Sequence, residues 1–238
     1  MGALRCALRD LEAGDVGGWV NALGNAKRAI DCQAERFAHC LGLPPCDRGP
    51  VPDNVAHFMH GTLDQSRWEA PALLPLIAEL NVAPIRVVQH YRGLRDMMEH
   101  HCAEVHKGTA TNAVEWAELF FYAVDRAMRS MVGSVTIGNS DISSNENGGI
   151  AYALVIEPRR KHDGQPPHFV LTEHREDEGE RTVAVTANKR CYLDLMNLML
   201  AIDLDNPLPD ALRRLVVSAG GEALLPALQD LHVEVEWA

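Results

Sequence analysis

WVNALGNAKRAIDCQAERFAHCL, residues 19–41, sets the architecture of the N-terminal half of the chain. Its apolar residues recur at steps of three, four or seven, at Trp19, Leu23, Ala26, Ile30, Phe37 and Leu41. This spacing places them on one stripe of an α-helix, so it predicts an amphipathic helix packed against a core. Gly42, followed by two prolines, is expected to end the helix.

The same helical period continues through residues 1–132. We predict a short apolar helix over 72–80 and a long helix that begins near Pro84. A further helix is predicted from Thr111 or Asn112, where Glu115 would complete a capping box. Residues 43–71 hold several Pro and Gly turn signals, and we predict a long connection there, with a helical turn at 54–60. Together these segments predict an antiparallel bundle of about four helices.

After Gly133 the hydrophobic period changes from that of helices to that of strands. Short β-branched segments separated by turn residues predict an antiparallel meander, with strands near 135–137, 150–156, 168–172 and 182–186. Residues 189–204 and 208–230 favour helices, and the alternation over 232–237 suggests a last edge strand. We therefore expect an α+β protein with two domains, a helical bundle over 1–132 and a small antiparallel sheet with helices over 133–238.

Composition narrows the class of protein. Of 238 residues, 47% are hydrophobic and 23% charged, which is enough to bury a core without disulfide or metal staples. The net charge of −11 argues against a protein that coats DNA and against a polybasic membrane binder. No segment has the ~18 apolar residues of a membrane helix. None of the six cysteines forms a Cys-x-x-Cys pair, so we expect reduced cysteines and a cytoplasmic location.

The negative charge is unevenly distributed. Residues 1–132 carry 13 basic and 16 acidic side chains, a net charge of −3, whereas residues 133–238 carry 9 and 17, a net charge of −8. The helical half is therefore the only plausible nucleic-acid side. The acidic half could dock a protein partner. Within it, the basic run 159–161 either contacts phosphate or forms a solvated turn.

One predicted helix is unusually rich in cations and histidines: residues 85–106, IRVVQHYRGLRDMMEHHCAEVH. Steps of three and four along it connect Arg92, Arg95 and Glu99. Cations at such spacings on a helix repel one another, so their concentration here needs a reason. One reason is a catalytic pair of Arg95 and His100. Residues five apart lie about 140° around an ideal helix. The pair would converge only if the helix ends or bends, or if a partner chain supplies the second group.

The chemistry of this pair suits RNA cleavage. A guanidinium can hold a phosphate by a bidentate contact. An imidazole with a pKa of about 6.5 can move protons at neutral pH. Together they suit attack of a ribose 2′-hydroxyl on the adjacent phosphate, a reaction that needs no metal.

Arg95-Asp96-Met97-Met98-Glu99-His100 resembles the Arg-x4-His motif of HEPN domains, helical bundles of which many are metal-independent endoribonucleases in bacterial defence and toxin systems. The Asn- and Ala-rich run 21–30 and the helix predicted after the motif are similar to HEPN helices, so the resemblance covers about residues 5–132.

The resemblance implies a reaction without cofactor or metal, catalysed by Arg95 and His100 with Asp96 as the polar helper. It also implies RNA as the partner molecule and a homodimer in which two motifs form one composite site. Arg92, on the same predicted helix, is a candidate for substrate binding. His101 directly follows His100, so either histidine can be the functional one.

Two alternatives fit the same residues. In one, the bundle is a HEPN-like module for dimerisation or for RNA or protein binding, and Arg95 and His100 belong to a solvated helix face. In the other, the chain is a metal-dependent phosphohydrolase that uses some of His100, His101, Cys102, Glu104 and His106 as ligands, or His57 with His60. The first set fits no tetrahedral ligand spacing.

Overall fold

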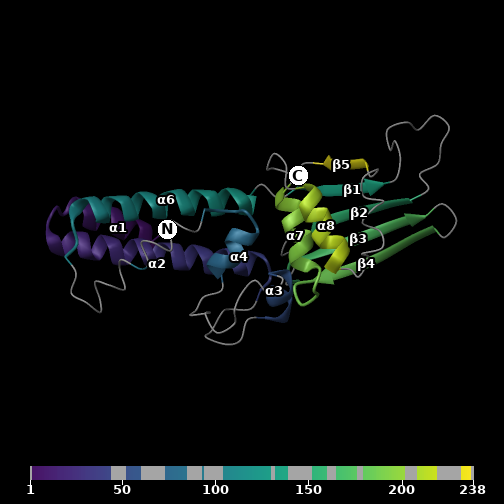
Figure 1. Cartoon of the computed structure of the whole chain (residues 1–238), viewed down its shortest axis with the longest axis horizontal. Helices are drawn as coiled ribbons and strands as arrows, with labels where there is room; N and C mark the ends of the chain where they lie inside the picture. The colour runs from purple at the N-terminus through teal and green to yellow at the C-terminus, as the bar shows by residue number, and fades with distance from the viewer. Residues whose placement is uncertain are drawn as a thin grey trace. The chain divides into compact units, whose positions relative to one another are not determined.

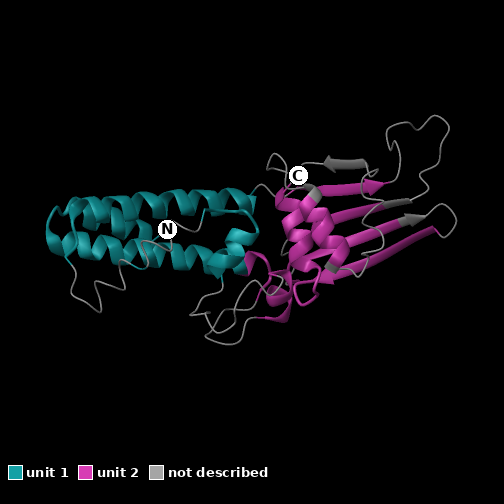
Figure 2. Ribbon diagram, in the orientation of Figure 1, with its two compact units in different colours: residues 1–38, 73–129 teal, residues 39–72, 130–238 magenta. Residues whose placement is uncertain are grey.

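The computed structural model describes residues 2–43, 52–59, 73–84, 93, 104–129, 132–138, 152–159, 165–175, 179–201, 208–218 and 232–236. The chain divides into two compact units (Figure 2). Unit 1 comprises residues 1–38 and 73–129, and unit 2 comprises residues 39–72 and 130–238.

Unit 1 is helical, as predicted, with α1 (Gly2–Glu12), α2 (Val16–Cys40), α4 (Leu73–Glu79) and α6 (Lys107–Arg129) (Figure 1). The predicted stripe of α2 is buried at Leu23, Ala26, Ile30 and Phe37. The α2 helix ends at Cys40, and Gly42 follows in the left-handed region with φ of 69°, which confirms the predicted stop. The N-terminal region is therefore built from amphipathic helices around an apolar core.

The turn between α1 and α2 brings two backbones unusually close. Asp15 caps α2, because its Oδ1 accepts a hydrogen bond from the Gly18 N–H at 2.7 Å. A Cβ added at Gly18 would lie 2.5 Å from the Asp10 carbonyl oxygen, closer than real Cβ atoms approach. Glycine at position 18 therefore permits the contact between α1 and α2.

Gly18→Ala is expected to destabilise unit 1 by roughly 1–3 kcal/mol, because the clashing atom is a backbone oxygen that cannot rotate away. Gly24→Ala is the matched control in the same helix. A Cβ at Gly24 meets nothing within 4 Å, so this change should stabilise by up to about 1 kcal/mol through helix propensity. Urea unfolding followed by circular dichroism measures both, and changes of the same sign and size would contradict the close approach.

The predicted start of α6 at Thr111 or Asn112 is wrong. The helix begins at Lys107, and the Ala110 N–H already donates to the His106 carbonyl oxygen at 3.2 Å. Gly108 lies inside the first turn of this helix. The helix is therefore one turn longer at its N-terminus than the capping signal indicates.

Unit 2 is built on an antiparallel sheet, which confirms the predicted meander. Its strands are β1 (Ser134–Gly138), β2 (Tyr152–Arg159), β3 (His168–Arg175) and β4 (Gly179–Thr186). The predicted last strand is β5 (His232–Glu236), which pairs with β1, so the order is β4-β3-β2-β1-β5. The register aligns Val135, Ile156 and Leu171 on one face of the sheet.

Helices α7 (Tyr192–Ala201) and α8 (Leu208–Ser218) lie over one face of this sheet (Figure 1). The Phe169 and Tyr192 rings, both nearly inaccessible to solvent, meet edge to face with centroids 5.2 Å apart. Every residue of α7 is buried. The core of unit 2 therefore lies between the apolar face of the sheet and α7.

Helix α3 (Asp53–Phe58) belongs to unit 2, although it precedes α4 of unit 1 in the chain. The Asn54 side-chain amide donates to the Ala187 carbonyl oxygen, and the Arg214 guanidinium lies 5.7 Å from the Phe58 ring centroid. The expected domains, 1–132 and 133–238, thus differ from the two units at residues 39–72 and 130–132. The contacts of α3 with α7, α8 and Ala187 are the physical reason that this helix belongs to unit 2.

Candidate functional site

All five predicted site residues lie outside the described part of the chain: Arg92, Arg95, Asp96, His100 and His101. The long helix predicted from Pro84 lies largely outside it as well. The nearest described segments end at Pro84 and resume at Glu104, with Gly93 between them. What the structure contributes is therefore the set of helices on either side of the motif in sequence.

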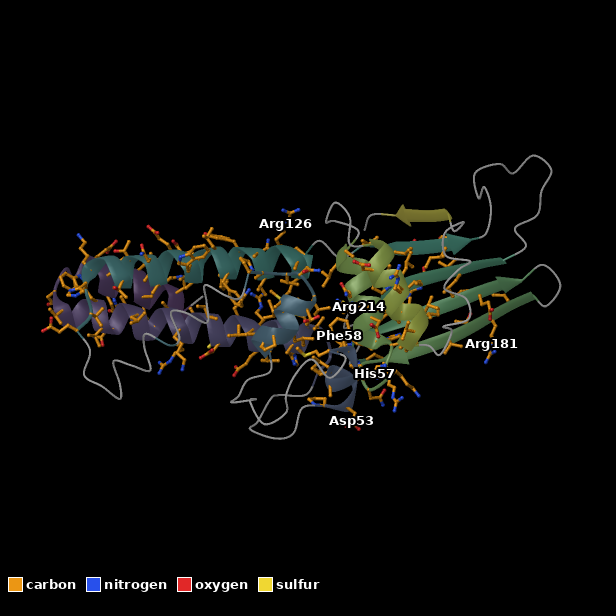
Figure 3. All side chains as sticks on the ribbon, in the orientation of Figure 1. Asp53, His57, Phe58, Arg126, Arg181 and Arg214 are labelled. Atoms are coloured by element: carbon orange, nitrogen blue, oxygen red, sulfur yellow. The ribbon has the colours of Figure 1, made fainter. Side chains whose placement is uncertain are left out.

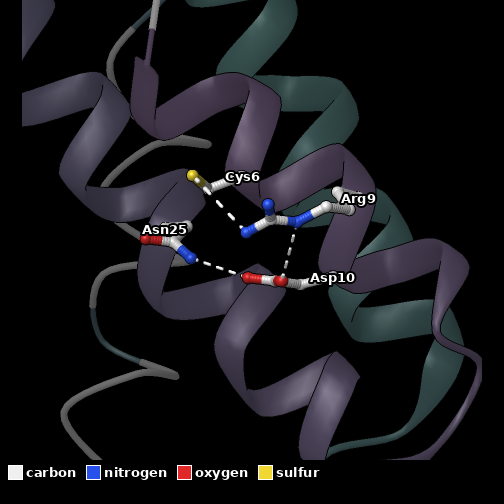
Figure 4. A network of polar contacts seen from close by, with 4 residues as sticks. All are labelled: Cys6, Arg9, Asp10 and Asn25. Carbon is white, nitrogen blue, oxygen red and sulfur yellow. Dashed lines mark hydrogen bonds and ion pairs between the residues drawn. The ribbon is translucent and has the colours of Figure 1, made fainter.

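Unit 1 holds a polar network in the part of the chain that carries the resemblance (Figure 4). The Asn25 side-chain amide donates to Oδ2 of Asp10 at 2.7 Å, and Arg9 Nε lies 3.9 Å from Oδ1 of the same carboxylate. Arg9 also approaches the Cys6 sulfur at 4.0 Å. Asn25, in the Asn- and Ala-rich run, therefore has a structural role, since it ties α2 to α1.

Helices α2 and α6, which precede and follow the motif in sequence, are joined by polar contacts. The buried Gln33 side chain donates to the Phe121 carbonyl oxygen at 3.5 Å. Asp125 on α6 forms ion pairs with Arg36 of α2 at 3.5 Å and with Arg129 at 2.7 Å. Neither Gln33 nor Asp125 belongs to a motif that the sequence reveals. Gln33 had a readable signal, because it is a polar residue at a core position between Ile30 and Phe37.

The arginines of this pair of helices remain largely open to solvent. The side chains of Arg36 and Arg129 are 57% and 76% exposed although both contact Asp125. Arg28 on α2 is exposed as well. Exposed guanidinium groups are chemically able to contact phosphate oxygens.

Unit 2 contains polar side-chain groups in its interior. Asp194 and Asn197 of α7 are 0% and 4% exposed, and Nε2 of His57 on α3 is buried. Burial raises the pKa of the Cys191 thiol above its usual value, and Asp194 raises it further. The thiol is therefore protonated at neutral pH and is a poor nucleophile.

Burial also raises the pKa of Tyr192 above its usual value of 10.0. Above pH 10 the unfolded chain loses the phenol proton while the folded protein keeps it, so the free energy of unfolding falls as the pH rises. Tyr192→Phe removes this proton and should lose less stability between pH 8 and about pH 11 than the wild type. Urea unfolding at the two pH values measures both losses, and equal losses would contradict the raised pKa.

The basic run of residues 159–161 is described only at Arg159, which ends β2. Its guanidinium contacts Glu157 at 2.8 Å, and His168 lies opposite it in the register of β3. Nδ1 of His168 lies 3.1 Å from the Pro166 carbonyl oxygen. Arg160 and Lys161 lie outside the described residues, so the phosphate hypothesis for this run stays a prediction.

The described residues can be examined for metal-binding groups and for helices that could span a membrane. Among them, no group of three or more His, Cys, Asp or Glu side chains is arranged to hold a metal ion. Of the candidate metal ligands, His60, His100, His101 and Cys102 lie outside that part of the chain. No described helix combines the length and the apolar character needed to cross a bilayer.

Neither a protein-family model, nor a curated protein, nor a solved structure matches this chain.

Proposed function

We propose that the chain is a metal-independent endoribonuclease of the HEPN type that cleaves RNA by attack of a ribose 2′-hydroxyl on the adjacent phosphate. The observation that carries the proposal is the motif Arg95-Asp96-Met97-Met98-Glu99-His100, which stands in the sequence between two helices of unit 1, α4 and α6. The buried stripes of α2 and α6 support it, because a HEPN domain is a bundle of such helices. The solvent-open arginines of unit 1 support RNA as the substrate.

Each motif residue has a stated role in this proposal. Arg95 holds the scissile phosphate and neutralises the charge that develops on it. His100, or His101 in its place, exchanges a proton with the 2′-hydroxyl or with the leaving 5′-oxygen. Asp96 orients the pair, and Arg92 contacts the neighbouring phosphate. The products carry 2′,3′-cyclic phosphate and 5′-hydroxyl ends.

The proposal extends to the assembly and to the acidic half of the chain. Two copies form a homodimer through the helical bundle, and each contributes a motif to one composite site. Unit 2 selects the substrate or binds a protein regulator. Its acidic character favours the protein regulator. The resemblance suggests a role in bacterial defence or toxin action, and the reduced cysteines expected from the sequence suggest the cytoplasm.

Digestion of pooled RNA in the presence of excess chelator tests the proposal. We expect cleavage to proceed at an unchanged rate after all divalent metal is removed, with cyclic-phosphate ends on the fragments. A rate that collapses with chelator and returns with zinc or manganese would contradict it and would favour the metal-dependent phosphohydrolase.

A further inference from the structure

The outward-facing side of α6 carries one continuous stripe of exposed side chains. It consists of Asn112, Glu115, Leu119, Tyr122, Arg126 and Arg129. Leu119 and Tyr122, in the middle of the stripe, are 57% and 66% exposed, although both have large apolar surfaces. Figure 3 shows Arg126 directed outward from the helix. The opposite side of α6 already packs in the core of unit 1 through Ala113, Ala117, Phe120 and Val124.

The order of residue types in this stripe has two-fold symmetry. The steps between its members are three, four, three, four and three, which read the same from either end. A two-fold axis that crosses α6 between Phe120 and Phe121 exchanges Leu119 with Tyr122. The same axis exchanges Glu115 with Arg126, and Asn112 with Arg129.

We propose that a second copy of this chain docks on this stripe, with the two α6 helices antiparallel. In that arrangement Leu119 of each copy packs against Tyr122 of the other, and each Glu115 faces an Arg126. Every contact occurs twice, as in any isologous interface. A parallel pair would instead place Glu115 against Glu115 and Arg126 against Arg126, which repel.

Charge complementarity is what favours a second copy over an unrelated partner. A single helix carries both halves of the match, an acidic end and a basic end on either side of an apolar centre. An interface centred on one helix is small, so we expect a Kd in the micromolar range. The inference deepens the proposed function, since it names the surface on which two copies would meet, and in that respect it rests on that proposal. The association itself depends only on residues of α6.

Sedimentation equilibrium of the full chain without RNA tests the inference. Glu115→Arg and Arg126→Glu each place like charges together twice, so each should weaken dimerisation by about tenfold or more. The double variant restores opposite charges at both places, so its Kd should return to within about threefold of the wild type. Arg28→Glu, the same charge reversal at an exposed arginine of α2, should leave the Kd unchanged.

Several results would overturn the inference. These are a wild type that stays monomeric throughout, single variants that dimerise like the wild type, or a double variant as weak as the sum of the singles. Leu119→Glu provides a second test. It should abolish the dimer and leave the thermal midpoint unchanged when the midpoint is measured below the Kd of the wild-type dimer, where both proteins are monomeric. A monomeric wild type in which this change lowers the midpoint would mean that the chain itself covers the stripe. Because no RNA is present, these results are independent of the digestion that tests the nuclease.

Discussion

The double variant Arg95→Ala, His100→Ala is expected to abolish RNA cleavage while the protein remains folded. Loss of a general acid or base lowers a rate by typically 10²- to 10⁴-fold. Loss of the cation at the phosphate removes charge stabilisation in the transition state. Because the two groups act on one reacting centre, we expect the double variant to be little slower than the slower of the single variants. The measurement is single-turnover cleavage of a labelled RNA in chelator.

Four further single substitutions provide the comparisons and the control for this experiment. Arg95→Lys keeps the charge but loses the bidentate contact, so it should retain only part of the activity. His101→Ala compared with His100→Ala identifies the functional histidine, since only one of them should be essential. Arg92→Ala should raise KM more than it lowers kcat. Arg213→Ala, at an exposed arginine of α8, should cleave like the wild type.

Cleavage by the double variant at the wild-type rate would rule out the assigned pair. If Arg95→Ala and His100→Ala bind RNA and dimerise normally, and the wild type cleaves no RNA under any condition, the binding-module alternative takes the place of the nuclease.

Phe169→Ala is expected to destabilise unit 2 by about 3–5 kcal/mol. The Phe169 ring is 1% exposed and meets Tyr192 at 5.2 Å, so its removal leaves a cavity between the sheet and α7. Such a loss is a large fraction of the 5–15 kcal/mol that stabilises a typical domain. Calorimetry should therefore show a transition for unit 2 at a much lower temperature.

Two substitutions separate this cavity effect from a general intolerance of the sheet. Phe169→Leu fills most of the space and should cost roughly 1.5 kcal/mol or less. Val183→Ala, at an exposed position of β4, should change the stability by about 0.5 kcal/mol or less. A Phe169→Ala protein within 1 kcal/mol of the wild type would contradict the placement of the core.

The local periodicity of apolar residues was sufficient to predict most of the helices and strands. The stripe at Leu23, Ala26 and Ile30 predicts α2, and the alternation at 232–237 predicts β5, because each pattern reports which side chains of one segment face a core. The motif at Arg95 and His100 could be found the same way, as a spacing of residue types. Its geometry could not, since residues five apart on a helix converge only through a bend or a second chain.

Contacts between distant segments were decided by tertiary structure alone. The stretch around Asn54 predicts a helical turn, but only its bond to Ala187 and the stacking of Arg214 on Phe58 assign it to the sheet unit. Likewise, the alternation of β5 does not identify β1 as its partner strand. No sequence pattern around Gly18 predicts that the Asp10 carbonyl oxygen lies against it. A sequence pattern records which face of a segment is buried, whereas its partner depends on how the whole chain closes.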